Sequence, residues 1–228
     1  MTDLPIERHI DARSAAHAAG AAIAAALAEG VRERGHGRFA GAGGRTPGET
    51  YAWLSTADLP WDKVTVTLTD ERWVDPDSPL SNEALLRDTL LQDRGAAARL
   101  LPLWSAAPSP EAAAEAAGPV LAEQLPLDAV LLGMGEDGHF ASLFPRSLVL
   151  ADGLDPDGQR LVVAAPVGEP MPPQPRISLT LAALLQTRLL ILLVTGEAKL
   201  KVLEAPEGLP ISALLTQTRT PVRILWAP

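Results

Sequence analysis

Continuous apolar runs recur along this chain. The runs DAVLLGMG, RLVVAAPV, RLLILLVTG and PVRILWA are typical of strands that are covered on both faces, as in a mainly parallel sheet flanked by helices. GRFAGAGG and VTVTLTD add two further strand candidates, the second with β-branched alternation. The run LLILLV is far shorter than the roughly 20 residues that a membrane helix needs. The pattern therefore predicts an α/β fold.

Helical signals alternate with these strands. Asp11 can cap an Ala-rich helix that runs toward Arg34. Thr46 and Pro47 form a good helix start, with the threonine hydroxyl as N-cap and proline in the first turn. Two more helices are expected to begin after Ser81 and Ser109. A proline-rich segment, residues 168–175, is expected to be a surface loop.

Length and composition favour one domain over residues 1–228. The net charge of −9 argues against broad nucleic-acid binding, which needs a basic face. Acidic residues precede the apolar N-terminal segment where a signal peptide would carry positive charge, so we expect a helix of the domain and no membrane partner. The absence of cysteine excludes disulfides and thiolate ligands and fits a reducing cytoplasm. We expect a monomer, although the sequence leaves an oligomer open.

Four polar or glycine-rich stretches follow predicted strands: GAGGRTP, TDERW, GMGEDGH and TGEAK. Ligands of open parallel sheets collect at the carboxyl ends of the strands, so these stretches should surround one site. In GAGGRTP, Gly43, Gly44, Arg45 and Thr46 join a glycine turn to a helix N-terminus, which attracts anions. A tight structural turn remains the alternative interpretation of this segment.

The segment TDER places Asp70 and Arg72 at the end of a strand. If the extended geometry continues, these two side chains share one side and could face a sugar. A solvated charge cluster is the simpler interpretation. Lys199 is expected in the first turn of a helix, where a bound anion would offset the unfavourable helix dipole, but it could also be a surface lysine. Arg176 is either an exposed helix-start residue or a second phosphate contact.

The segment GMGEDGH carries the sharpest functional signal. The imidazole of His139 can take a proton from water near neutral pH, and Asp137 can hold the ring in one tautomer. A Ser-His-Asp hydrolase is poorly supported because the sequence contains no GxSxG motif. Ser142 is expected to make only a local hydroxyl contact. The spacing of the other histidines does not favour a metal site.

The stretches GAGGRTP, TDERWV, SNEALLRDTLL, GMGEDGHFASLFP, RISLTLAALL and TGEAK, in this order, resemble the glucosamine-6-phosphate isomerase/6-phosphogluconolactonase family over nearly the whole chain. The GMGEDGHFASLFP block is the most specific of them. The resemblance implies a Rossmann-like α/β/α fold with a mainly parallel sheet. It also implies hydrolysis of 6-phospho-D-glucono-1,5-lactone to 6-phospho-D-gluconate in the oxidative pentose phosphate pathway, without a metal or another cofactor.

Carried over by motif, the resemblance makes His139 the general base and Asp137 the residue that orients it. The turn from Gly43 to Thr46, together with Arg72, Arg176 and Lys199, would surround the phosphate or the sugar. One departure is Arg45, because the turn in this family usually reads GGSTP, and this raises a question about the phosphate pose.

Two other functions could use the same motifs and fold. Glucosamine-6-phosphate deaminase shares the DGH block but has a catalytic glutamate where this chain has Phe144. A sugar-phosphate sensor could use the same fold without catalysis, but it would normally carry a DNA-binding segment.

Overall fold

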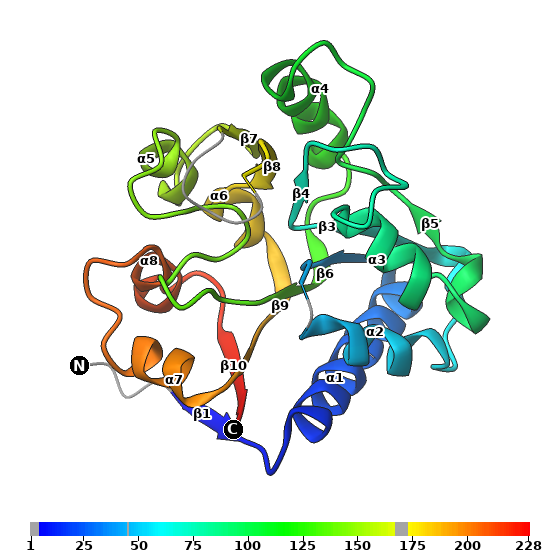
Figure 1. The fold of residues 1–228 in the computed structure, drawn as a ribbon. Helices are drawn as coiled ribbons and strands as arrows, with labels where there is room; N and C mark the ends of the chain where they lie inside the picture. The colour runs from blue at the N-terminus through cyan, green and yellow to red at the C-terminus, as the bar shows by residue number, and fades with distance from the viewer. Residues whose placement is uncertain (1–4, 45, 167–172) are drawn as a thin grey trace.

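The computed structural model describes residues 5–44, 46–166 and 173–228, and its largest element is a seven-stranded sheet (Figure 1). All neighbouring strands in this sheet are parallel, which confirms the prediction of a mainly parallel α/β sheet. The strands, in spatial order, are β1 (Ile6–Arg8), β10 (Val222–Ala227), β9 (Thr187–Thr195), β6 (Leu127–Leu132), β2 (Gly37–Gly41), β3 (Val64–Leu68) and β5 (Arg99–Leu100).

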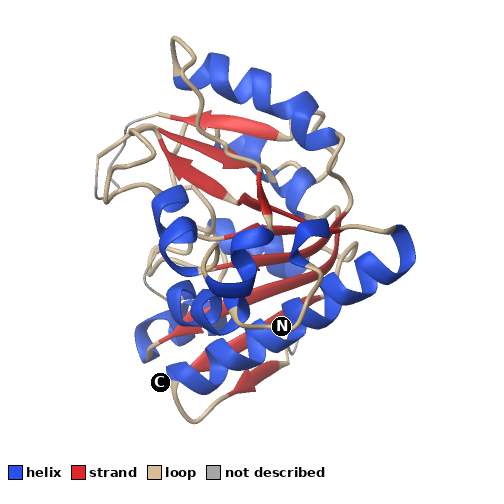
Figure 2. Ribbon diagram, turned by 90° about the vertical axis from the view of Figure 1, so that its right-hand side faces the viewer, coloured by secondary structure: helices blue, strands red, loops and turns tan. Residues whose placement is uncertain are grey.

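Helices flank this sheet (Figure 2). They are α1 (Ala12–Arg34), α2 (Pro47–Ser55), α3 (Asn82–Thr89), α4 (Pro110–Ala122), α5 (Leu150–Leu154), α6 (Leu181–Leu184), α7 (Glu197–Glu204) and α8 (Pro210–Thr216). The predicted caps Ser81 and Ser109 both accept a hydrogen bond from a backbone N–H in the first turn of α3 and α4. The proline-rich segment predicted as a loop lies outside the described residues as far as position 172.

The long helix α1 begins and ends as its sequence predicts. The Asp11 carboxylate accepts a hydrogen bond from the Ser14 backbone N–H at 2.7 Å, and Gly35 ends the helix with a φ of 79°. By length and composition alone α1 could cross a membrane. In the structure it packs against α2 and the sheet, and Ala19, Ile23 and Leu27 are fully buried. Its apolar residues therefore form part of the core.

A second sheet lies beside the first and is antiparallel. It consists of β4 (Asp70–Arg72), β8 (Arg176–Leu179) and β7 (Val162–Ala165). The sequence predicted that the apolar run containing β7 belongs to the parallel sheet, and this was wrong. The run is buried because α4 covers β7. An apolar run reports burial on both faces and does not specify the direction of the neighbouring strand.

The chain order of the main sheet reverses at β2. From β2 the chain continues to β3 and β5 on one side, and it returns to β6 on the other side. Ligands bind at such switch points, in the crevice outside the carboxyl ends of the strands. The glycine turn after β2 and the GMGEDGH segment after β6 therefore begin at the same crevice.

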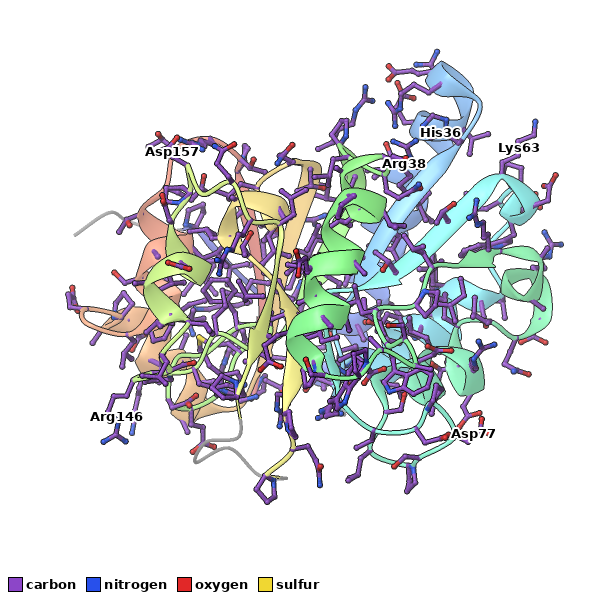
Figure 3. All side chains as sticks on the ribbon, turned by 90° about the horizontal axis from the view of Figure 1, so that it is seen from above. His36, Arg38, Lys63, Asp77, Arg146 and Asp157 are labelled. Carbon is purple, nitrogen blue, oxygen red and sulfur yellow. The ribbon has the colours of Figure 1, made fainter. Side chains whose placement is uncertain are left out.

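A buried ion pair connects β2 and β6 at the end of the sheet opposite the crevice. Asp128 of β6 is completely buried, and its carboxylate accepts hydrogen bonds from the Arg34 guanidinium and, at 2.8 Å, from the Arg38 backbone N–H. By contrast, the charged side chains of turns, such as Lys63 and Asp157, point outward at the periphery (Figure 3). The buried carboxylate thus joins α1, β2 and β6 at one point.

Replacement of Gly30 by alanine tests how much the close packing around the Asp128–Arg34 ion pair contributes to stability. An added Cβ would lie 2.5 Å from the Asp128 carboxylate, so the methyl group and the ion pair cannot occupy the same space. Alanine normally favours a helix over glycine by about 1 kcal/mol. We nevertheless expect Gly30→Ala to lower the free energy of unfolding by at least about 2 kcal/mol, since it disturbs a buried ion pair.

Urea denaturation measures this effect. Gly48→Ala is the control, because its added Cβ would meet nothing within 4 Å. Equal stability of Gly30→Ala and the wild-type protein would show that the carboxylate does not need its present position.

Candidate active site

One pocket collects residues from both sheets and from three strand ends of the main sheet. Its lining includes these eight sequence-predicted residues: Gly43, Gly44, Thr46, Asp70, Arg72, His139, Arg176 and Lys199. Asp137 does not line the pocket but contacts His139. Arg45 lies outside the described residues. Among the lining residues to which the sequence assigned no role are Asn82 and Met134.

The glycine turn after β2 is shaped by close neighbours. A Cβ at Gly43 would lie 1.9 Å from the Asn82 amide oxygen, and Gly44 has a φ of 92°. Both positions therefore require glycine. The Tyr51 hydroxyl donates a hydrogen bond to the Ala42 carbonyl at 2.6 Å and so holds the start of the turn.

Thr46 lines the pocket. The sequence predicted that its hydroxyl caps α2, and this was wrong. Its backbone already has helical angles, φ −62° and ψ −41°, and its side chain makes no cap hydrogen bond. An N-cap residue normally has an extended backbone, which lets its side chain reach back to the first turn. The helix begins at Pro47 as expected.

Asp137 and His139 form a carboxylate–imidazole pair. His139 Nδ1 lies 2.5 Å from Asp137 Oδ1, and the same oxygen accepts the His139 backbone N–H at 3.2 Å. Because an ionised carboxylate only accepts, Nδ1 carries the proton in this pair, and Nε2 of the neutral ring is left as an acceptor. A Cβ at Gly135 would lie 2.3 Å from the imidazole, so glycine makes room for the ring.

The ionisation of Asp137 suits this role. Partial burial acts to raise the pKa of this carboxyl, but the hydrogen bond from His139 and the charge of the imidazolium outweigh it and hold the pKa below its usual value. Asp137 therefore stays ionised at neutral pH. The side chain of His139 is 29% exposed, so its ring remains accessible from the pocket.

Phe144 lies between His139 and Arg176. Its ring centroid is 4.3 Å from that of the imidazole, and the Arg176 guanidinium carbon lies 5.1 Å from the Phe144 centroid. The guanidinium is within the range of a cation–π contact. This aromatic ring occupies the position at which the deaminase sequences carry a glutamate, and it offers no proton.

Arg176 lies on strand β8 and is 5% exposed, so of its two alternatives the exposed helix-start residue is excluded. Its Nη1 is 4.0 Å from Asp70 Oδ2, and burial lowers its pKa while the charge of Asp70 acts to raise it. The Ser142 hydroxyl donates to the same Asp70 oxygen at 2.5 Å. The simpler interpretation of Ser142 was a contact at a helix or turn start, and the sequence did not predict this long-range bond.

Glu71 joins strand β4 to the start of α3. The Glu71 carboxylate accepts hydrogen bonds from the backbone N–H groups of Arg72, Asn82 and Glu83 and from the Ser81 hydroxyl. Burial raises the pKa of Glu71, and the hydrogen bonds act in the opposite direction. Asp70 and Arg72, which flank Glu71, both line the pocket, so the predicted shared side is confirmed.

Lys199 is the third residue of α7 and lines the pocket from the end of β9. Its place in the first turn of a helix confirms the prediction. Together with Arg72 and Arg176 it brings three cationic side chains to the pocket of a protein whose net charge is −9. Such a local concentration of positive charge suits a small anion.

Within the described ranges, no three His, Asp or Glu side chains are grouped so that they could hold a metal ion. The described site can thus supply a histidine held by a carboxylate, three cations and a glycine turn at a helix N-terminus.

Comparison with known proteins places these features in a family. Residues 10–225 match the family model described as glucosamine-6-phosphate isomerases/6-phosphogluconolactonase. The 6-phosphogluconolactonase of Caulobacter vibrioides is 46% identical over 92% of this chain and 91% of its own length. That of Rhizobium meliloti is 41% identical over 90% and 91%.

A solved structure agrees with the sequence matches. The crystal structure of a 6-phosphogluconolactonase from Shewanella baltica superposes with a TM-score of 0.93 at 35% identity, and the match covers 100% of this chain and 99% of that one. The fold expected from the family resemblance is therefore confirmed. This chain belongs to the glucosamine-6-phosphate isomerase/6-phosphogluconolactonase family.

Proposed function

We propose that this protein hydrolyses 6-phospho-D-glucono-1,5-lactone to 6-phospho-D-gluconate in the oxidative pentose phosphate pathway, with His139 as the general base. The observation that carries the proposal is the Asp137–His139 pair, which leaves Nε2 as the basic nitrogen at a pocket rich in cationic side chains. The names of the relatives from Caulobacter vibrioides and Rhizobium meliloti support the same substrate.

In the first step, His139 Nε2 accepts a proton from a water molecule while the water oxygen attacks the lactone carbonyl carbon. A tetrahedral intermediate with a negatively charged oxygen results. Asp137 stabilises the imidazolium through the hydrogen bond at Nδ1. Because the imidazole itself takes the proton, we propose that this step needs no metal ion.

In the second step, the carbonyl forms again and the bond between this carbon and the ring oxygen breaks. The leaving ring oxygen takes the proton from Nε2, which restores the neutral imidazole. The product is an open-chain acid that ionises at neutral pH. One histidine thus serves as base and then as acid.

The phosphate is proposed to bind where positive charge and free backbone N–H groups meet. Arg72, Arg176 and Lys199 line the pocket, and the glycine turn leads into the N-terminus of α2. Arg45, which replaces the serine usual in the family, is proposed as a further contact. Asp70 is proposed to contact the sugar hydroxyl groups.

Deamination of glucosamine 6-phosphate is less well supported. Phe144 fills the space beside the imidazole, and no acid stands at that position of the motif. We further propose that residues 1–228 act as one domain. We also propose that the protein works in the cytoplasm, since the sequence contains no cysteine and proteins of that reducing compartment rarely carry disulfides.

His139→Asn should remove the proton acceptor while its amide keeps a polar group in the pocket. General acid–base catalysis contributes about 10²–10⁴-fold, so we expect kcat to fall at least about 100-fold. The assay generates the lactone from glucose 6-phosphate with its dehydrogenase and couples the product to 6-phosphogluconate dehydrogenase. The spontaneous rate is subtracted.

The control for this variant is His36→Asn. His36 lies at the periphery, beyond the end of α1 (Figure 3), so its replacement should leave kcat unchanged. Hydrolysis by His139→Asn at the wild-type rate would show that another group is the base.

Lys199→Ala should weaken binding of the phosphate without removing the base. We expect KM for the phosphorylated lactone to rise about tenfold or more, the size of one lost charge-assisted hydrogen bond, while KM for glucono-1,5-lactone stays nearly constant. Lys201→Ala is the matched control, because Lys201 is an exposed lysine on the same helix. If Lys199→Ala raised both KM values equally, the phosphate role of Lys199 would be refuted.

A further inference from the structure

Asn82 is the only asparagine of the 228-residue sequence, and it lies in the pocket. It is the first residue of α3, and only 1% of its surface is exposed. A buried amide must satisfy its hydrogen-bonding groups within the protein. The partners of this amide therefore indicate what it does.

The two ends of the Asn82 amide are held by different partners. The oxygen Oδ1 accepts from Arg72 Nη1 at 2.5 Å, and the nitrogen Nδ2 donates to the Asp70 carbonyl at 2.8 Å. A guanidinium only donates and a carbonyl only accepts, so the reverse orientation of the amide would break both bonds. The orientation of the amide is thus fixed by chemistry.

The Arg72 guanidinium makes its hydrogen bonds to described residues through one nitrogen, Nη1, which donates two of them. The two hydrogens of Nη1 have two acceptors, Asn82 Oδ1 and, at 3.0 Å, the Leu80 carbonyl. Within the described part of the chain, the buried Nε of Arg72 has no hydrogen-bond partner. Because Nε is buried, the donors that remain for a ligand in the pocket are on Nη2.

Asn82 also determines how closely the glycine turn approaches. A Cβ at Gly43 would overlap the amide group, with contacts of 1.9–2.4 Å to its outer atoms. The backbone N–H of Asn82 is held by Glu71 Oε1 at 2.7 Å. A single side chain thus contacts the turn, strand β4 and the Arg72 guanidinium.

We propose that Asn82 is a positioning residue for the anionic substrate, acting through Arg72; this rests on the phosphate role given to Arg72 in the proposed function. The amide aims the guanidinium and, because it is neutral, leaves the positive charge of Arg72 available to the phosphate. Aspartate has the same shape, but its carboxylate would pair with Arg72 and repel the phosphate. It could not donate to the Asp70 carbonyl either.

Asn82→Asp tests the requirement for a neutral side chain. We expect its Kd for 6-phosphogluconate to rise at least about tenfold, as for one lost charge-assisted hydrogen bond, with KM for the phosphorylated lactone rising in parallel. KM for glucono-1,5-lactone should change little. Gln186→Glu, an amide-to-acid change at an exposed site, is the control for added charge and should leave all three values unchanged.

A double-mutant cycle tests whether Asn82 acts through Arg72. Asn82→Ala should raise the Kd for 6-phosphogluconate in the wild-type background and have no further effect in the Arg72→Ala background. The cycle does not require Asn82→Asp to fold. Equal effects of Asn82→Ala in both backgrounds, or an unchanged Kd in Asn82→Asp, would overturn the proposal.

Isothermal titration calorimetry with 6-phosphogluconate keeps this test separate from the proposed reaction. If the wild-type protein bound the ligand without hydrolysing the lactone, the catalytic proposal would fail while the role of Asn82 could still be measured. If the wild-type protein hydrolysed the lactone and the Asn82 variants bound the ligand normally, only the inference about Asn82 would fail.

Discussion

The parallel pairing of β2 with β6 places the glycine turn and the Asp137–His139 segment at the same edge of the sheet, and the rest of the pocket is built around these two segments. Phe39 pairs with Ala129 and Ala40 with Val130, although some 90 residues separate the two strands in the sequence. Parallel strands that pair in register end at the same edge of the sheet. The glycine turn and the Asp137–His139 segment therefore leave the sheet side by side. The Asp128 ion pair fastens the opposite end of the same two strands.

The second sheet supplies the other half of the pocket. Strands β4 and β8 carry Asp70, Arg72 and Arg176, and their antiparallel register brings Arg72 opposite Arg176. Two neighbouring guanidinium groups repel each other, so carboxylates are needed close by. Asp70 lies 4.0 Å from Arg176, and the buried Glu71 holds the backbone of Arg72. A bound phosphate would add further negative charge to this cluster.

Much of this arrangement could be predicted from the sequence, because its signals are local. Apolar or alternating runs predicted strands β2, β3, β6, β7, β9 and β10 but not the short strands β1, β4, β5 and β8. Serine or aspartate followed by helix formers predicted the starts of α1, α3 and α4. Most of the predicted pocket residues were found because they follow strand ends. The errors concern which segments pack or pair with one another. Burial of β7 by α4, and the place of Arg176 in a strand, depend on segments that are distant in sequence.

Contacts between distant residues also explain what was missed inside the pocket. Ser142 and Asp70 are 72 positions apart, and nothing around either residue announces their hydrogen bond. Asn82 was visible within SNEALLRDTLL, but its value depends on the positions of Arg72 and Gly43. The Thr46 cap was also predicted wrongly, because its backbone has helical angles and its hydroxyl makes no cap hydrogen bond.

The spread of the pocket along the chain has a consequence for synthesis on the ribosome. Its lining begins at Ala42 and ends at Lys199, and β6 is paired on one side by β2 and on the other by β9. A nascent chain that has emerged only as far as β6 holds the glycine turn without Arg176 or Lys199. Because domains fold as units, ligand can assist folding only after α7 has left the exit tunnel. Until then the early strands depend on their own packing.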